Sequence, residues 1–141
     1  MLITYSVFAI LVVALLISTV KLPVHAAGWI VSFDVNELLY IPFDVENRYS
    51  EISGFDRVKL VYENSDESLT YWATTEIGWN NVSSWDETLT LNNGTTAYYT
   101  STDETQMISW RTGDVEYAID YTSTKPIAKS ELIKVASKAV E

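Results

Sequence analysis

Very few side chains in this sequence could carry out acid–base, nucleophilic or metal chemistry. The chain has no cysteine and a single histidine, His25, which lies close to the N-terminus. Over the rest of the chain, a Ser–His or Cys–His nucleophile has no residues to use. A zinc site built from thiolate or imidazole ligands is excluded for the same reason. We therefore expect no catalytic residues of these kinds and no cofactor.

Neighbouring carboxylates are the first remaining candidates for catalysis. The densest pairs are Asp86-Glu87 and Asp103-Glu104, and two carboxylates can act together in glycoside hydrolysis. The chain has 19 acidic and 9 basic residues, and in so acidic a protein most carboxylates are solvated surface groups. The surface interpretation is therefore favoured for both pairs.

Two further arrangements give no support to catalysis or metal binding. Lys129 and Ser130 are adjacent on an expected helix and cannot face each other as a dyad. Oxygen ligands for calcium occur between Glu63 and Glu67, but the spacing is not that of an EF-hand and a plain turn explains it. The sequence therefore predicts a protein that is not an enzyme and has no metal site.

Aromatic side chains are the stronger indication of function. The chain has five tryptophans and nine tyrosines. Exposed rings beside the polar stretch 80–84 could form the lip of a binding site for a peptide, a lipid or a glycan. The residues concerned are Trp72, Trp79, Trp85 and Tyr98. The general burial of large aromatics favours the alternative, that these rings shield sheet edges or cover the second face of the sheet.

Charge and glycosylation triplets limit the partners further. The formal net charge is −10, and because a nucleic-acid surface needs basic residues, nucleic acid is not expected as a partner. The excess of acidic residues is explained most simply by the solubility that a high net charge gives a protein. Asn81 and Asn93 each begin an Asn-x-Ser/Thr triplet, which could accept a glycan outside the cell.

An uncharged N-terminal segment indicates the compartment. Leu2 through Val20 contain no charge, proline or glycine, and spanning a bilayer takes about 20 such residues. Residues 1–26 are interpreted either as a signal peptide cleaved after Ala26 or as a retained transmembrane anchor. The run has no basic residue before it and Lys21 after it, which fits neither alternative cleanly. Both place the domain outside the cytoplasm, on the cell membrane or secreted.

The rest of the chain predicts an antiparallel sheet. From residue 55 onward apolar and polar residues alternate with period two, and the segments are rich in Tyr, Trp, Val and Thr, which is typical of half-buried strands. About six strands in meander order are expected: 57–63, 69–74, 88–92, 95–100, 108–111 and 114–121. Asn93-Gly94 marks a tight hairpin between two of them. The core is expected to include Tyr62, Trp110, Tyr117 and Tyr121.

The C-terminal segment changes to helical periodicity. Leu132, Val135, Ala136 and Ala139 follow the i, i+3, i+4, i+7 pattern of an amphipathic helix, which would pack across one face of the sheet. Ala128, at the expected N-cap, cannot accept a capping hydrogen bond.

The expected fold class is therefore α+β, with an N-terminal hydrophobic helix, the sheet and a C-terminal helix. Residues 55–141 would form the sheet-and-helix domain. Residues 27–54 would form a lead-in segment with a short helix or an edge strand before Pro42.

Several segments resemble a known domain family. They are 91–99 with Asn93-Gly94, 108–119 with Trp110 and Gly113, and 130–136 with Glu131-Leu132, while 58–62 looks like the first strand. Together they are similar to the domain-of-unknown-function family numbered 4367, a small extracytoplasmic domain of membrane-anchored and anti-sigma-associated proteins. The resemblance covers roughly residues 55 to 138 and is carried by motif order rather than by any single motif.

The resemblance has two departures, Ala128 at the helix cap and Ser137-Lys138 at the helix end. It implies a curved sheet and helix similar in shape to lipoprotein carriers and periplasmic stress sensors, in which the sheet cradles a ligand. Fold similarity of this kind does not transfer function.

Two functions follow as expectations. The first is a non-enzymatic, membrane-associated domain that senses or binds a peptide, a lipid or a glycan on the concave sheet face. The alternative is a structural or assembly subunit of the cell surface, in which residues 27–33 add as a strand to another sheet.

Overall fold

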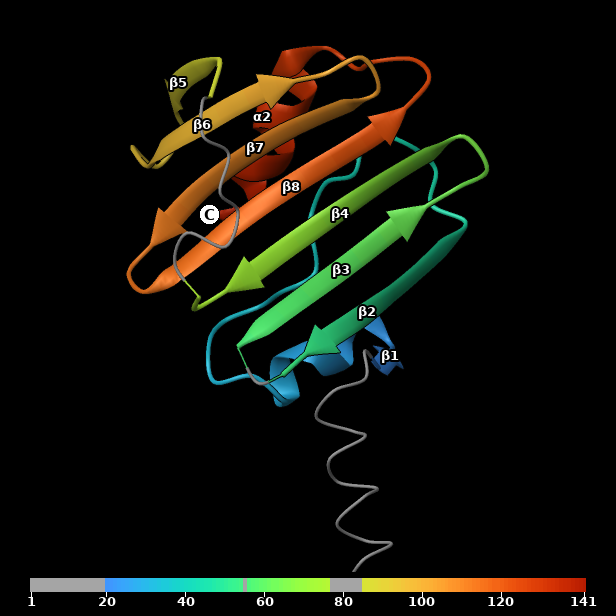
Figure 1. Cartoon of the computed structure of the whole chain (residues 1–141), viewed down its shortest axis with the longest axis vertical. Helices are drawn as coiled ribbons and strands as arrows, with labels where there is room; N and C mark the ends of the chain where they lie inside the picture. The colour runs from blue at the N-terminus through green and yellow to red at the C-terminus, as the bar shows by residue number, and fades with distance from the viewer. Residues whose placement is uncertain (1–19, 55, 77–84) are drawn as a thin grey trace, which may run out of the picture.

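The computed structural model describes residues 20–54, 56–76 and 85–141. Within these residues, eight strands form one antiparallel sheet in the order β1-β2-β3-β4-β8-β7-β6-β5. Figure 1 shows the strands in one twisted layer, with the helices behind it. The strands are β1 (Val20–Leu22), β2 (Asn47–Ser53), β3 (Arg57–Glu63), β4 (Glu67–Thr74), β5 (Glu87–Thr90), β6 (Thr96–Ser101), β7 (Thr105–Thr112) and β8 (Val115–Ser123). The predicted antiparallel sheet with a C-terminal helix, α2 (Lys129–Ala139), is confirmed.

The sheet consists of two four-stranded meanders, β1–β4 and β5–β8, that meet where β4 pairs with β8. The prediction of about six strands in one meander is therefore wrong in strand count and in the order of the second half. The six predicted strands correspond to β3–β8, and β1 and β2 were missed. In β2 the positions paired with the core-facing residues of β3 are Arg48, Ser50 and Ile52. Only one of these is apolar, so β2 shows no alternation that sequence reasoning could detect.

Different elements cover the two halves of the core face. In Figure 1, α2 lies behind β6, β7 and β8, whereas the 3-10 helix η1 (Val24–Trp29) and the irregular segment 30–46 lie behind the other half. The 11 residues of α2 span about 16 Å, but eight strands make a sheet about 34 Å wide. Because one helix cannot cover this width, the N-terminal segment completes the core and a seam runs between the two covers.

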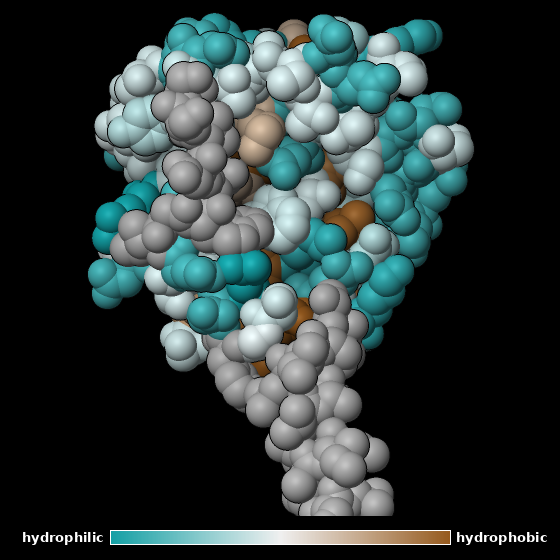
Figure 2. Space-filling view, viewed as in Figure 1, coloured by the Kyte–Doolittle hydropathy of each residue, from teal (hydrophilic) through white to brown (hydrophobic). Residues whose placement is uncertain are grey.

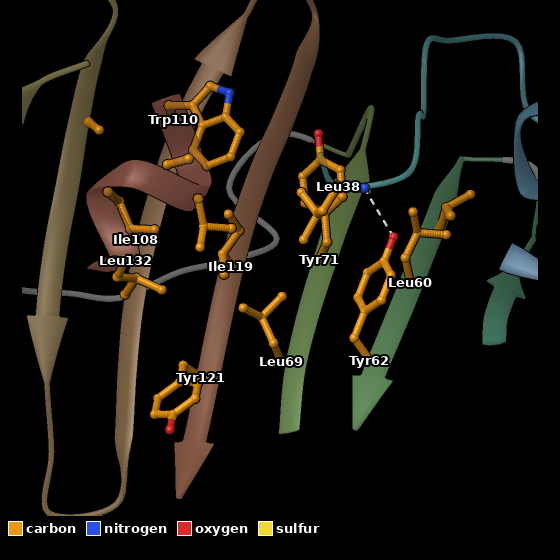
Figure 3. Close-up of a cluster of buried hydrophobic side chains, with 14 of the residues drawn as sticks. Leu38, Leu60, Tyr62, Leu69, Tyr71, Ile108, Trp110, Ile119, Tyr121 and Leu132 are labelled. Atoms are coloured by element: carbon orange, nitrogen blue, oxygen red, sulfur yellow. Dashed lines mark hydrogen bonds between the residues drawn. The ribbon is translucent and has the colours of Figure 1, made fainter. Parts of the chain in front are cut away.

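The core between the sheet and its covers combines aliphatic and aromatic residues. Leu132 and Val135 of α2 are fully buried in the same cluster as Ile108 of β7, and Leu38 of the N-terminal cover belongs to it as well. Figure 3 shows Leu38 beside Tyr71, and its backbone N–H donates a 3.0 Å hydrogen bond to the hydroxyl of Tyr62 on β3. This bond satisfies a buried donor of the irregular segment.

A buried glutamine fixes the start of α2. The Gln106 side chain donates to the Ile127 carbonyl (2.9 Å) and accepts from the Ile127 N–H (3.0 Å). Its amide also donates to the Tyr99 hydroxyl (3.1 Å). At the next position, Ala128 is the N-cap and makes no side-chain capping bond, as predicted. The Gln106 bonds therefore hold the helix start where a capping side chain is missing.

The predicted N-terminal hydrophobic helix falls largely on residues 1–19, which lie outside the described residues. Among the described residues, none of the helices has the length and apolar character that crossing a membrane requires. The described part of the predicted 1–26 segment belongs to the folded domain. Residues 20–22 form β1, and Ala26 lies inside η1, where Val24 and Ala27 are buried. The buried Ser50 hydroxyl lies within hydrogen-bond distance of the carbonyls of Leu22 (3.2 Å) and Pro23 (3.0 Å).

Candidate functional site

A cavity of about 590 Å³ lies at the seam between the two covers. Its walls come from residues 34–39 of the N-terminal cover, from the C-terminal end of α2 and from β4, β7 and β8. This volume falls within the range of small-ligand sites, about 300–1,000 Å³. The seam cavity, as we call it below, therefore has room for a small ligand or for a side chain of a larger one.

Three aromatic rings form one wall of the seam cavity: Tyr71 of β4, Trp110 of β7 and Tyr117 of β8. Their centroids are 6.1, 5.9 and 5.7 Å apart and their planes lie within 20° of one another. A column of three stacked rings would separate the outer two about twice as far as its neighbours. The three centroids therefore form a triangle rather than a column, and Figure 3 shows the rings of Trp110 and Tyr71 nearly face-on at the same end of the sheet.

The Tyr71 hydroxyl is the unusual polar group of this wall. Tyr71 is 5 % exposed, and among the described residues its hydroxyl has no hydrogen-bond partner. Burial raises the pKa of Tyr71 well above its ordinary value, because phenolate is disfavoured away from water. The neighbouring Tyr117 differs, since its hydroxyl donates to the Asp34 carbonyl at 2.9 Å. The Tyr71 hydroxyl is not one of the fully buried unpaired side-chain atoms of the described residues, so it remains open to water or to a ligand atom in the cavity.

The rim of the seam cavity is negatively charged. It carries the carboxylates of Asp34, Glu37 and Glu141 and a single ammonium, that of Lys138. Lys138 lies 3.0 Å from the Glu141 carboxylate, so its charge is largely paired. The C-terminal end of α2, which also lines the cavity, adds the negative end of the helix dipole. Arg48 lies 3.9 Å from Glu37 in a pair whose two side chains are each about half exposed, which screens the attraction.

The structure separates the aromatic residues that the sequence predicted as a binding lip. Trp72 and Tyr98 lie on the sheet face turned away from α2, in one row of the register that runs through Ala118 and Ser109. Two strands therefore lie between them. The Trp85 ring packs against Tyr98, with centroids 6.2 Å apart. Figure 2 shows this face as mostly hydrophilic, with scattered hydrophobic residues.

The remaining predicted residues of this lip, Trp79 and the possible glycan acceptor Asn81, lie outside the described residues. The other possible acceptor, Asn93, is exposed at the tight turn between β5 and β6, and it lines the seam cavity. Its side-chain oxygen accepts from the Thr95 N–H at 2.9 Å. Use of either triplet stays a prediction.

Trp72 is held by a buried carboxylate on the same face. Its indole N–H donates to Asp120 Oδ2 at 2.9 Å, and the Lys59 ammonium lies 5.1 Å from the centre of its ring. Burial raises the pKa of Asp120, and the indole hydrogen bond opposes this rise. Among the described residues, Asp120 Oδ1 has no hydrogen-bond partner. These contacts make Trp72 part of a polar network rather than a free ring.

The carboxylates considered for catalysis bind neighbouring groups. Asp86 accepts from the Thr100 hydroxyl (2.7 Å) and the Ser101 N–H (3.1 Å), and these bonds lower its pKa. Glu87 pairs with Lys129 at 2.6 Å. No group of three or more potential metal ligands occurs within the described part of the chain.

Sequence reasoning assigned Trp110 and Tyr117 to the core, placed Tyr71 on one face of a strand, and did not identify the seam cavity as a site. Trp110 is buried as predicted, but Tyr117 is only half-buried. The alternation of β4, β7 and β8 does place Tyr71, Trp110 and Tyr117 on one face. What alternation could not supply was the pairing of β4 with β8 or the path of residues 34–39.

Comparison with known proteins adds no further identification. No family model matches the chain, and no curated protein and no solved structure matches it either.

Proposed function

We propose that this chain is a non-enzymatic binding module, held at the outer face of the cell membrane by its N-terminal segment, and that it takes its ligand in the seam cavity. The observation that carries the proposal is the hydroxyl of Tyr71, which has no hydrogen-bond partner among the described residues and belongs to a residue that lines a ligand-sized cavity. A few polar groups in an otherwise apolar pocket typically fix the orientation of a bound ligand. The resemblance to family 4367, in which a sheet cradles a ligand, agrees with this proposal.

Binding fits the groups around the seam cavity better than catalysis does. Its walls supply aromatic rings, side-chain amides and carboxylates, and His25 is not among them. Tuned acid–base pairs usually show opposed pKa shifts within one site. Burial raises the pKa of both tyrosines of the aromatic wall, Tyr71 and Tyr117, so these two shifts run in the same direction.

The start of the sheet favours a retained anchor over cleavage after Ala26. β1 begins at Val20, the last residue of the uncharged run. Cleavage after Ala26 would remove β1 together with Val24 and the two carbonyls beside the Ser50 hydroxyl. The folded domain would then lose the packing of Val24 and the strand that pairs with β2, which would lower its stability.

The proposal can be tested by NMR on the full chain in detergent micelles, with the indole N–H resonances as reporters. A Trp110→Phe variant assigns the Trp110 signal. A panel of peptides, lipids, glycans and small amines is then titrated. At least one member is expected to shift the Trp110 resonance before those of Trp72 and Trp85.

Two matched variants decide where such a ligand binds. Thr112→Phe places a ring in the seam cavity, since Thr112 lines it, and is expected to abolish binding. Thr122→Phe makes the same change at an exposed position of β8 on the opposite sheet face and should leave binding intact. A ligand that shifts only the Trp72 or Trp85 resonance and binds equally well to the Thr112→Phe variant would contradict the proposal. This result would support the predicted site on the opposite sheet face.

The alternative, an assembly subunit that donates residues 27–33 to another sheet, has less support. Ala27 and Val31 are buried in the core, so donation would expose them. Among the described strands, the two sheet edges are β1, of 3 residues, and β5, of 4 residues. Short edges are a usual means of limiting strand addition. Under the binding proposal, light scattering of the full chain should show a monomer in each micelle.

A further inference from the structure

We propose that the ligand of the seam cavity carries a protonated amine or a guanidinium group. This inference rests on the proposed function, because it assigns the chemistry of the ligand that the cavity would take. Three features of the cavity, described in turn below, favour a cation that can donate hydrogen bonds.

The first feature is the charge of the walls. The carboxylates of Asp34, Glu37 and Glu141 line the cavity. Glu141 pairs with Lys138, and Glu37 lies 3.9 Å from Arg48 in a half-exposed pair. Asp34 is therefore the carboxylate of this set without an ion pair among the described residues. In addition, the last carbonyls of α2 have no N–H partner further along the helix and carry its negative dipole end. An anionic ligand would be repelled by this arrangement, and a neutral ligand would gain nothing from it. A cation would be attracted by every part of it except the paired Lys138.

The second feature is the aromatic wall. Tyr71, Trp110 and Tyr117 form a cluster with their planes within 20° of one another, and Figure 3 shows the rings of Tyr71 and Trp110 nearly face-on and side by side. The faces of Trp and Tyr rings attract cations, and the attraction grows when the cation is removed from water. A guanidinium plane can also lie flat on such a wall.

The third feature is the Tyr71 hydroxyl, which narrows the kind of cation. Tyr71 is buried and its oxygen has no partner among the described residues, so this oxygen is available to accept a hydrogen bond. A primary ammonium or a guanidinium group has N–H donors for it. A quaternary ammonium has none and would leave the hydroxyl unpaired. The donor-bearing cation could come from a basic side chain of a peptide or from a polyamine, and the experiment includes both.

The test uses pairs of probes that have nearly the same shape but differ in charge. N-acetyl-arginine amide and the corresponding citrulline derivative are titrated into the full chain in micelles, with the Trp110 indole signal as the readout. Spermidine is the polyamine probe. The arginine derivative is expected to bind about ten-fold more tightly than the neutral citrulline derivative. Raising the salt concentration from about 20 mM to about 500 mM should weaken the binding of the arginine derivative several-fold and leave the binding of the citrulline derivative unchanged.

Variants that each remove one feature of the cavity test the features separately. Asp34→Asn combined with Glu37→Gln should reduce the preference for arginine over citrulline to within about two-fold, because the charge of the rim is lost. Tyr71→Phe keeps the ring and should weaken the arginine derivative by about ten-fold through loss of the acceptor. Spermidine is expected to follow the same pattern if the cation alone is recognised, and to bind more weakly than arginine if a peptide backbone is also required.

The outcomes distinguish this inference from the proposed function. Equal binding of arginine and citrulline, abolished by Thr112→Phe, would overturn the cation assignment and leave the cavity as a binding site. The cation assignment would also be overturned if only neutral members of the wider panel shift Trp110. If no compound produces a shift that Thr112→Phe removes, both proposals fail.

Discussion

At the scale of single residues, two buried tyrosines on neighbouring strands differ in how their hydroxyls are used. Tyr62 accepts the Leu38 N–H at 3.0 Å, whereas the Tyr71 hydroxyl has no partner among the described residues. Tyr62→Phe should therefore leave a buried N–H unpaired and lower the free energy of unfolding by about 1–3 kcal/mol. Tyr71→Phe should change it by less than about 0.5 kcal/mol, since no hydrogen bond is lost.

Urea unfolding of the two variants measures this difference, and each serves as the control for the other. Equal destabilisation would show that the Tyr71 hydroxyl has a partner, such as a bound water, and would remove the main support for the seam cavity as a binding site.

Asp120 gives a residue-scale prediction of pH dependence. Burial raises its pKa in the folded protein, so the ionised carboxylate costs stability once the pH rises above its unfolded pKa of about 3.9. Asp120→Asn keeps an acceptor for the Trp72 indole but carries no charge. The variant and the parent should be equally stable near pH 3.5. As the pH rises through the folded pKa of Asp120, the variant should become more stable by an amount on the order of 1 kcal/mol.

The measurement is urea unfolding of both proteins at several pH values. Asp114→Asn, at an exposed turn, should show no such divergence. A variant that is less stable than the parent at neutral pH would mean that the Asp120 charge is stabilised by a partner.

At the scale of elements, the sheet depends on its short first strand. β1 covers the edge of β2, and the Ser50 hydroxyl lies beside the carbonyls of Leu22 and Pro23. A chain that begins at Ala27 should be less stable than one that begins at Val20 by roughly 3 kcal/mol or more. This estimate adds the lost burial of Val24 to the lost hydrogen bonds between β1 and β2.

Urea unfolding of the two shortened chains tests this prediction. Equal stability would mean that β1 contributes nothing, and the structural argument against cleavage after Ala26 would then fail.

The same elements show what could be read from the sequence. The alternation of β3, β4, β7 and β8 and the period of α2 follow directly from side-chain patterns, because these elements each have one apolar face. β2 could not be recognised, since Ser50 and Arg48 take core-facing positions and are satisfied by contacts distant in sequence. The seam cavity could not be predicted from the sequence for a related reason. It forms where residues 34–39, which have no regular pattern, pass the end of α2.

At the scale of the whole molecule, exposed apolar residues near β1 indicate how the domain would sit on a membrane. Trp29 is 79 % exposed and Ile30 is 45 % exposed, and Figure 1 places η1 at the same end of the molecule as β1. Under the proposed attachment to a membrane, a net charge of −10 would repel anionic headgroups, so apolar groups would have to make the contact with the bilayer. Tryptophan is favoured at the membrane–water interface.

In bilayers that contain brominated lipid, the tryptophan fluorescence of the full chain should be quenched. Trp29→Phe should remove most of this quenching, while Trp85→Phe should leave it in place. Quenching that is unchanged in Trp29→Phe would place η1 away from the membrane surface.

The position of β1 has a consequence for the reach of the module. Under the proposed retained anchor, the uncharged run ends at Val20, which is also the first residue of β1, so no linker sequence separates the anchor from the domain. Held in this way, the seam cavity could sample only a layer about 35 Å deep above the bilayer, the size of a domain of this length. Its ligand would have to arrive at the membrane surface, by diffusion along it or delivery to it, because the module could not extend outward to capture it.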